Sequence, residues 1–551
     1  MNINSVVDYL NKTNGYDVPT GYYAHIQEWE DWWKGYHKPF HDFKESGYDG
    51  KTIKRKIYSL KMGKKVCEDW ASILLNEKTE VVIDGKKNND FINSVFELNT
   101  FWQSANELVE KTFYSGTGAF VLRFEGLKLS GEKALGSKDT KIRMEYLSAL
   151  NIVPLSVKYG KIVDVAFVSD VMHEGKNYVY VETHVLKGTG YVISNQYFKK
   201  EAGSLNPIPL PDGMIEEFST KSDIPLFSII KPNIVNTIDG SNGLGMSVFA
   251  NSIDNLQGVD LCYNNFNRDF KLGGKKVFLN DSLTTTTESG EKITPDDTAQ
   301  QLFIQFGDDF IDKNGSNNLI QEFNPSLRVQ ENIDGLQAQL DYLSFKCGFG
   351  TKHYQFNAGA IITATQYVGD KQELMQNASK NYIVVERALK VLIKAILWAG
   401  KNICGIDLDE NPEIKVNFDD SYIIDTESEL LSMQQDVASG LIRPEIYLAK
   451  KYGATEKEAL KMMPAASTTV EDNPFDQALK NIEPPTANTT VIDTAENVTG
   501  KSLNGAQTQS LIAILSQYSA GELTLGQAIN VISISIGITK DEAKKIIEGA
   551  E

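Results

Sequence analysis

A glycine-rich turn near residue 126 is the first place to look for phosphate chemistry. Gly126 and Gly131 have the separation that a phosphate-binding loop requires. Such a loop continues with Lys and then Ser or Thr, because the ammonium and hydroxyl groups bind the phosphates and Mg²⁺. Here Glu132 and Lys133 follow the second glycine. We therefore expect a surface turn rather than a nucleotide site.

A second small-residue segment, Ser115-Gly-Thr-Gly118, resembles a dinucleotide-binding fingerprint only in its spacing. That fingerprint follows a strand and opens a helix. The order is reversed here, since a helical pattern precedes the glycines and a strand-like pattern follows them. Close packing of small residues is the better prediction for this segment.

Histidines, cysteines and acidic pairs give no recognisable metal or catalytic site. His37 and His41 have the i, i+4 spacing of helical metal ligands, but Pro39 lies between them and argues against a regular helix. Acidic pairs such as Asp419-Asp420 are typical of solvated loops. No CxxC motif is formed by the four cysteines, Cys67, Cys262, Cys347 and Cys404. We predict no metal site, no cofactor and no enzymatic activity.

One basic and aromatic group does suggest a contact with nucleic acid, namely Lys346, Lys352, His353, Tyr354 and Phe356. Lysines can touch passing phosphates and aromatic rings can stack on bases, and each such contact is modest and salt-dependent. The alternative is an ordinary surface loop that carries lysines. Composition alone favours that alternative.

Two long helical patterns flank this group and must position it. The first covers 326–347, and its apolar stripe consists of Val329, Ile333, Leu336, Leu340, Leu343 and Cys347. A glycine-rich loop, 348–362, follows. The second helix begins after Thr363, which forms a capping box with Gln366, and extends to about residue 400.

An earlier helix, predicted over 248–270, has an equally narrow apolar stripe, as expected for a helix that packs against neighbours along its length. A polar insert with short strands, 271–325, separates it from the helix at 326–347. Short alternating strands fill 119–230 and predict an antiparallel sheet. The fold class is therefore α+β.

Other segments complete the predicted organisation. Helical patterns lie at 57–76, 90–112, 426–439, 444–451 and 455–462. Residues 464–502, which are rich in Pro, Thr and Asn, are predicted to be a flexible linker. Residues 503–551 are predicted to form a small helical pair.

Composition limits the classes of function. A chain of 551 residues is expected to contain several modules. Its net charge of −18 argues against a protein that grips nucleic acid by neutralising phosphates. The N-terminus lacks the features of a signal peptide, and no apolar run reaches membrane-spanning length. We expect a soluble protein of a reducing cytoplasm that makes no membrane contact.

The order of these segments resembles the portal proteins of tailed, siphovirus-like double-stranded DNA bacteriophages and prophages. Segment 60–77 is similar to the early helix of that family, and the helices around 271–325 are similar to its stem and clip. Ile362-Thr-Ala-Thr-Gln-Tyr-Val368 resembles the family's Thr-Ala-Thr-Glu-Val segment, with Gln366 in place of the usual Glu. Segments 426–448 and 453–459 resemble its late region, and 503–543 resembles the helical tail of some members.

The resemblance implies a portal-type subunit with a wing of helices and antiparallel strands, a helical stem, a small α/β clip and a helical crown. The implied boundaries are 1–247 and 363–424 for the wing, 248–270 and 326–347 for the stem, 271–325 for the clip, 348–362 for a tunnel loop, 425–463 for the crown, 464–502 for a linker and 503–551 for a C-terminal module.

The resemblance also implies partners and a location. About twelve subunits would form a closed ring at one capsid vertex of the virion, assembled in the host cytoplasm, with double-stranded DNA passing through its centre. The terminase motor, a head-completion or adaptor protein, and the major capsid or scaffolding protein would bind it. An acidic chain suits a conduit that must not retain DNA. The competing class is a phage-associated nuclease or glycan-processing enzyme, which would need a carboxylate or histidine cluster that the sequence does not reveal.

Overall fold

The computed structural model describes most of the chain in two separate compact units, 1–463 and 464–551. The described residues are 3–46, 50–76, 78–130, 133–136, 140–173, 175–188, 190–201, 204–211, 214–280, 285–286, 288–289, 292–293, 303–306, 320–355, 364–418, 426–439, 441–452, 459–460, 462, 514, 518, 523–536 and 539–548. Mixed helices and antiparallel sheets confirm the predicted α+β class.

Six helices near the N-terminus surround an aromatic core that contains Trp29, Trp70 and Phe113. They are α1 (Ile3–Asn14), α2 (Tyr22–Lys34), α3 (Lys38–His41), α4 (Met62–Leu74), α5 (Lys86–Leu98) and α6 (Phe101–Ser115). The prediction of a single helix over 90–112 is wrong. Thr100 adopts a left-handed conformation with φ of 44°, so the chain breaks there into α5 and α6.

Antiparallel sheets occupy the region predicted to contain short strands. The strands up to residue 230 are β1 (Asp42–Ser46), β2 (Thr52–Lys56), β3 (Glu80–Ile83), β4 (Gly118–Glu125), β5 (Lys128–Ser130), β6 (Lys133–Leu135), β7 (Lys141–Ser148), β8 (Ile152–Lys158), β9 (Lys161–His173), β10 (Lys176–Lys187), β11 (Gly190–Glu201), β12 (Ser204–Ile208), β13 (Glu217–Ser219) and β14 (Phe227–Ile230). One sheet has the order β12-β11-β10-β9-β8, with β13 added to β11, and another has the order β14-β4-β7. The helix predicted from residue 57 begins only at Met62, because Lys61 has a left-handed backbone with φ of 57° that a helix cannot include.

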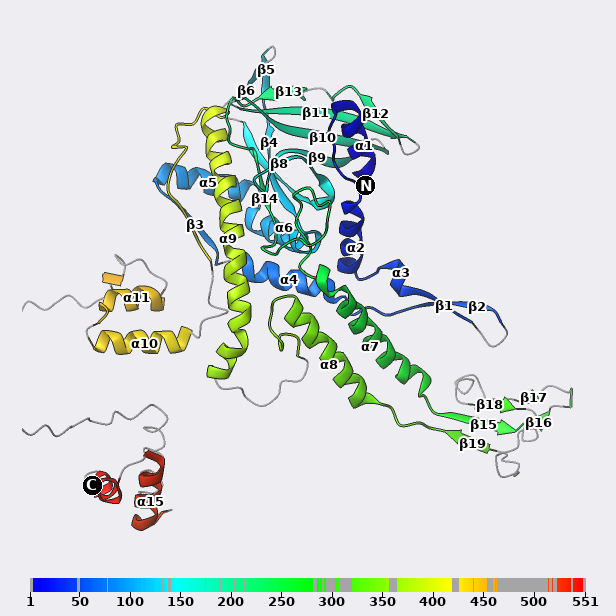
Figure 1. Ribbon diagram of the computed structural model, residues 1–551, viewed down its shortest axis with the longest axis vertical. Helices are drawn as coiled ribbons and strands as arrows, with labels where there is room; N and C mark the ends of the chain where they lie inside the picture. The colour runs from blue at the N-terminus through cyan, green and yellow to red at the C-terminus, as the bar shows by residue number, and fades with distance from the viewer. Residues whose placement is uncertain are drawn as a thin grey trace, which may run out of the picture. The chain divides into compact units, whose positions relative to one another are not determined.

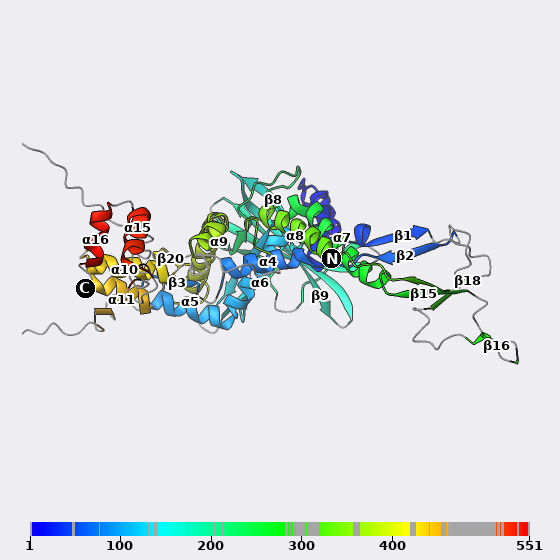
Figure 2. The same cartoon turned by 90° about the horizontal axis from the view of Figure 1, so that it is seen from below.

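Two helices, α7 (Ile253–Leu272) and α8 (Val329–Lys346), extend from the sheet region side by side, with the insert at their far end (Figures 1 and 2). They match the helices predicted over 248–270 and 326–347 to within a few residues at most ends. The described insert strands are β15 (Lys276–Asn280), β16 (Thr285–Thr286), β17 (Lys292–Ile293), β18 (Phe303–Phe306) and β19 (Ile320–Phe323). Strand β15 lies between β18, to which it is parallel, and β19, to which it is antiparallel.

The long helix α9 (Ala364–Asn402) packs against β14 and α4. Its predicted apolar stripe is buried, with Val385, Leu389, Leu392 and Ile396 each at most 3% exposed. Strand β20 (Ile414–Asn417) pairs with β3 and so returns the chain to the N-terminal half.

The remaining described helices lie near the predicted positions. They are α10 (Thr426–Ala438) and α11 (Pro444–Tyr452) in the first unit, and α15 (Leu525–Ile536) and α16 (Lys540–Glu548) in the second. The second unit has its own small core around Ala528, Ile532, Ala543 and Ile547. The predicted helix at 455–462 lies largely outside the described residues, and the predicted linker at 464–502 lies entirely outside them. Among the described residues, no helix is long and apolar enough to cross a membrane.

The Ser115–Gly118 segment forms a backbone junction with the loop that leads into α7. Gly116 ends α6 with φ of 80°, and a Cβ on it would overlap the carbonyl group of Gly245. The Gly245 amide donates a hydrogen bond to Thr117 Oγ1 (2.8 Å), and the Val248 amide donates one to the Phe113 carbonyl (2.9 Å). The prediction of close packing between small residues is confirmed, and this junction fixes where α7 leaves the body.

The Gly116→Ala substitution is expected to lower the free energy of unfolding by about 2–4 kcal/mol. The new methyl group combines left-handed backbone strain with an overlap against a backbone that cannot move aside easily. Chemical denaturation monitored by tryptophan fluorescence measures the change. The control is Gly160→Ala, which has φ of 73° but nothing within 4 Å of its Cβ position. Equal losses in both variants would mean that strain alone, and not the close contact, limits this junction.

Candidate functional site

The segment after α8 begins with a sharp helix termination at Gly348. This residue has φ of 86°, and its amide donates to the Phe345 carbonyl (3.1 Å). The Phe349 amide donates to the Ser344 carbonyl (3.0 Å). These are the two hydrogen bonds of a Schellman motif, which requires a left-handed residue at this position. The motif turns the chain away from α8 and starts the segment predicted to be a tunnel loop.

Trp70 on α4 holds this segment against the body of the molecule. Its indole Nε1 donates to the Cys347 carbonyl (3.1 Å). Its ring lies 4.9 Å from the ring of Phe349, which is only 1% exposed. Asn377 on α9 donates to the Gly348 carbonyl from the other side (3.1 Å). The beginning of the loop is therefore fixed by two helices that are distant in sequence.

Asp69, the neighbour of Trp70, anchors the next turn. His353 Nε2 lies 3.5 Å from one carboxylate oxygen, and Lys65 Nζ lies 2.6 Å from the other. Burial raises the pKa of Asp69, but hydrogen bonds from His353, Lys65 and Tyr354 outweigh it, so the net pKa is lowered. The His353 ring also stacks on Phe349 at 4.4 Å. His353 thus faces the body of its own subunit.

The other predicted contact residues have different surroundings. Lys346 is exposed and donates to the Asn251 carbonyl (3.2 Å). Lys352 is exposed in the turn. Burial raises the pKa of Tyr354, aided by the negative charge of Asp69.

The predicted contact Phe356 and the predicted cap Thr363 lie outside the described residues. Gln366 lies in the first turn of α9, and its side chain is likewise outside them.

Sequence reasoning missed Asp69 and Trp70 as partners of this loop. Both lie within the 60–77 segment that carries the family resemblance, which was the only available signal, since 277 residues separate Trp70 from Cys347. A cavity of about 250 Å³ lies beside the contact, with Trp70, Cys347 and Asn377 among its lining residues.

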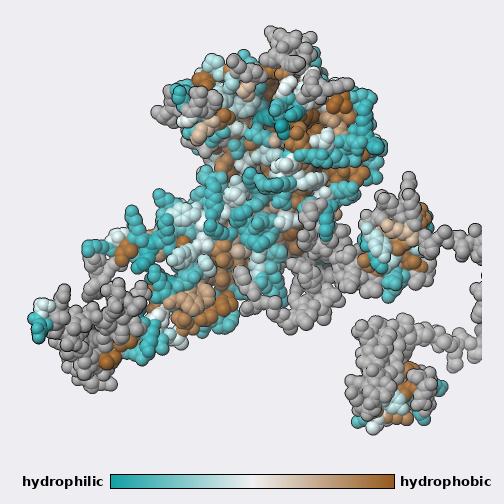
Figure 3. Space-filling view, turned by 180° about the vertical axis from the view of Figure 1, so that it is seen from behind, coloured by the Kyte–Doolittle hydropathy of each residue, from teal (hydrophilic) through white to brown (hydrophobic). Residues whose placement is uncertain are grey.

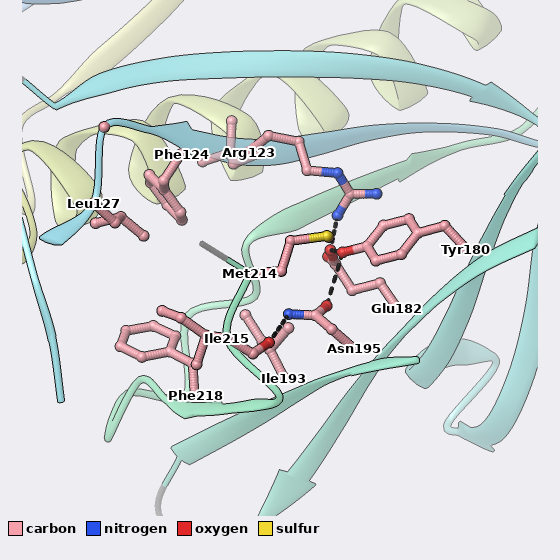
Figure 4. Close-up of a pocket in the computed structure, with 12 residues that line it drawn as sticks. Arg123, Phe124, Leu127, Tyr180, Glu182, Ile193, Asn195, Met214, Ile215 and Phe218 are labelled. Atoms are coloured by element: carbon pink, nitrogen blue, oxygen red, sulfur yellow. Dashed lines mark hydrogen bonds and ion pairs between the residues drawn. The ribbon is translucent and has the colours of Figure 1, made fainter. Parts of the chain in front are cut away.

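A second cavity, of about 240 Å³, lies between the two sheets and is the strongest alternative site (Figure 4). Its polar side chains turn toward one another. Arg123 forms ion pairs with Glu182 and Glu145, and the Tyr180 hydroxyl lies 2.7 Å from Glu182 Oε2 and 2.8 Å from Asn195 Oδ1. The charged and polar groups of this network therefore pair with one another, so they are not free to bind a ligand.

Glu182 is the buried centre of this network. Burial alone raises its pKa, but the Arg123 charge and the contact with His184 (2.5 Å) lower the net pKa to about 2. A carboxylate with this pKa stays ionised at neutral pH and cannot serve as a general acid. The structure assigns it a stabilising role between β4 and β10.

The remaining histidines do not gather into a metal site. His41 is buried and its Nε2 lies 3.1 Å from Asp260 on α7, rather than joining His37 as a metal ligand. In the described part of the chain, no group of three or more His, Cys, Asp or Glu side chains could hold a metal ion.

The Glu182→Gln substitution is expected to lower the free energy of unfolding at pH 7 by about 3–5 kcal/mol, because it leaves the Arg123 charge buried without its main partner. The native pKa of Glu182 is depressed, so its stabilising contribution is present above the unfolded value near 4.5 and disappears as the pH falls toward 2. Denaturation curves between pH 7 and pH 2 measure this. The variant should lose less stability than the parent over that range.

Glu125→Gln is the matched control for this substitution. Glu125 pairs with Arg143 at 2.8 Å on the surface, where water screens the charges. The unfolding midpoint of the Glu125→Gln variant should differ little from that of the parent at pH 7. Identical pH profiles for the parent and Glu182→Gln would show that the buried pair does not govern acid stability.

No curated protein sequence matches the chain. Among solved structures, the chain is similar to a chain described as "Neck of native GTA particle computed with C12 symmetry", with 10% identity, 71% of this chain and 89% of that chain covered, and a TM-score of 0.34.

A family model described as "Phage portal protein, SPP1 Gp6-like" matches residues 20–469. This match includes α7, α8, the insert between them, the described start of the loop after α8, and α9. Portal proteins are structural rather than enzymatic, in keeping with the self-satisfied network around Glu182. The chain belongs to the SPP1 Gp6-like family of phage portal proteins, which form the conduit for DNA packaging and ejection at the capsid vertex of the virion.

Proposed function

We propose that about twelve copies of this chain close into a ring and that residues 348–362 line its channel. The observation that supports this most directly is the double anchoring of the start of the loop, through Trp70 Nε1 to Cys347 and through Asn377 to Gly348. A loop beside moving DNA needs a fixed base, and this base is fixed to both α4 and α9. Lys352 lies exposed immediately beyond it.

Lys346 and Lys352 are the proposed DNA contacts, and His353 and Tyr354 hold the turn that presents Lys352. Asp69 sits opposite His353 and offsets a positive charge there, so His353 contributes less to phosphate attraction than the lysines do. A few lysines on a chain of net charge −18 give weak, sequence-independent contacts. Weak contacts allow DNA to slide in both directions. Phe356 belongs to the same proposed surface.

The remaining parts take the roles of the portal architecture in this proposal. The terminase motor docks at the clip, 271–325, during packaging, and a head-completion or adaptor protein replaces it there afterwards. The major capsid or scaffolding protein surrounds the ring at the vertex. Residues 425–463 form the crown on the interior side. Thr363 and Gln366 cap the long helix that follows the loop.

Replacing both Lys346 and Lys352 with Gln is expected to lower the amount of packaged DNA per head by about threefold or more, because two phosphate contacts per subunit are lost around the ring. Nuclease-protected DNA in an in vitro packaging reaction measures the effect. Ring formation, followed by electron microscopy, should be unchanged. The expected loss should diminish at higher salt, where the parent contacts are themselves screened.

Lys158→Gln with Lys161→Gln provides the control, since it removes the same charge from exposed lysines at the β8–β9 turn. This control should package like the parent. Unchanged packaging in the Lys346 and Lys352 variant would remove these lysines from the proposed DNA path. Parent protein that remained monomeric under all assembly conditions would contradict the ring itself.

A further inference from the structure

The β1–β2 hairpin projects from the body beside α7 and carries an unusual charge for this acidic chain (Figure 1). Residues 42–46 and 50–56 contain five Lys or Arg and only two acidic residues. Every residue of β2 is exposed. An isolated two-stranded hairpin is only marginally stable in water. Its form and charge therefore suggest that a partner covers it.

The two faces of this hairpin have different surroundings. Side chains alternate between faces along a strand, so the directly paired Lys44 and Lys54 share one face, whereas Glu45 lies on the other. Glu45 pairs with Arg55 on the hairpin and with Arg268 on α7 (3.3 Å). The Glu45 face is therefore turned toward α7, and the face of Lys44 and Lys54 is turned away from it.

Lys44 and Lys54 form a like-charge pair directly across the hairpin, which is unfavourable unless an anion lies nearby. Both are exposed. Within the described residues, neither has an acidic partner. Asp42 and Lys56, which are also directly paired, lie on the same face, so this face carries three lysines and one carboxylate. An acidic surface is the partner that would relieve the remaining repulsion.

Helix α7 separates this hairpin from α8. At 100° per residue, Gly258 and Asp269 lie on one face of α7, and they contact Gln339 and Arg328 of α8, respectively. Just before α7, the Asn251 carbonyl accepts a hydrogen bond from Lys346 of α8. The opposite face carries the residues that hold the hairpin and its base, Asp260 and Asn264. Helix α7 therefore lies between the β1–β2 hairpin on one side and α8 on the other.

The outer face of α8 is acidic. Glu331 and Asp334 are exposed, Asp341 is half-buried, and all three lie away from the Asn332–Gln339–Lys346 face that packs on α7. Gln330 and Gln337 donate to Asp334 and Asp341 (both 2.8 Å), but an amide leaves the negative charge in place. Within the described residues, none of the three acids forms an ion pair.

The two outer sides of this hairpin–α7–α8 unit thus carry complementary charges. The hairpin side carries lysines, and the α8 side carries carboxylates. We propose that the Lys44–Lys54 face of the hairpin docks on the Glu331–Asp334–Asp341 face of α8 in a neighbouring copy of this chain. The proposal rests on the ring of the proposed function. A ring is closed by one surface meeting a different surface on the next copy, and these flanks supply such a pair.

Apolar side chains on the α8 flank fit the same partner. Tyr342 and Phe345 of α8 are 59% and 54% exposed. Figure 3 shows apolar residues on the lower, projecting part of the first unit as well as on its upper part. A second copy would cover apolar and charged groups together. Free DNA would be attracted to the lysines but repelled by the acidic flank.

Two charge-reversed proteins test this interface. The first carries Lys44→Glu and Lys54→Glu, and the second carries Glu331→Lys and Asp334→Lys. In either protein alone, every hairpin would meet an α8 face of the same charge. At a concentration where the parent assembles, each should show at least a tenfold loss of rings by native mass spectrometry. An equimolar mixture should recover rings, and these should alternate the two proteins because only unlike neighbours are compatible.

Thermal unfolding of each full-length variant verifies that it folds, and Lys158→Glu with Lys161→Glu controls for the change in net charge. Normal rings from either reversed protein alone would overturn the proposed interface while leaving the ring intact. So would a mixture that fails to recover rings, or a reversed hairpin that assembles normally but loses binding to DNA or to the terminase. Absence of rings from the parent would instead overturn the proposed function, and this interface with it.

Discussion

A buried carboxylate, Asp260 on α7, fixes how this helix packs on the body of the subunit. It is 3% exposed and accepts hydrogen bonds from the Leu60 amide (2.7 Å) and from His41 (3.1 Å). Burial raises the pKa of Asp260 despite these bonds. A polar group this deep in the protein is stabilised only while its partners stay in place. Helix α7 therefore cannot rotate without leaving buried polar groups unsatisfied.

Other close contacts constrain α7 and α8 in the same way. Gly116 and Gly245 bring two backbones closer than any side chain would allow, and the Schellman motif at Gly348 ends α8 beside Trp70. Each is a close contact between segments far apart in sequence. Together they connect α7 to the sheets and the end of α8 to the segment that follows Gly348.

Periodicity predicted the long elements well and the short contacts poorly. The apolar stripes of α7 and α8 have a helical period over about five turns, so their positions could be predicted from the sequence alone. The β1–β2 hairpin has no such stripe, because β2 is exposed throughout, and it was not predicted. The break at Thr100 also escaped prediction, since threonine does not signal a left-handed residue.

The candidate site shows the same division. Lys352 could be selected because its residue type and its place in a glycine-rich loop are visible in the sequence. Asp69 could not, since its role depends on a tertiary contact with His353, 284 residues away by number, that no local pattern encodes. A similar limit applies to His41, whose partner is a carboxylate on α7, 219 residues away, that no local pattern indicates.

The distribution of charge on the chain affects both the proposed assembly of the ring and the proposed passage of DNA through it. Copies with a net charge of −18 repel one another, but at physiological salt this repulsion fades beyond about 8 Å. Contacts that close a ring must therefore act at short range, through apolar groups and locally opposite charges. Placing lysines on a projecting hairpin satisfies this requirement without making the whole surface basic. The same placement leaves the acidic remainder free to repel DNA, so that assembly and passage of the genome use different parts of one charge pattern.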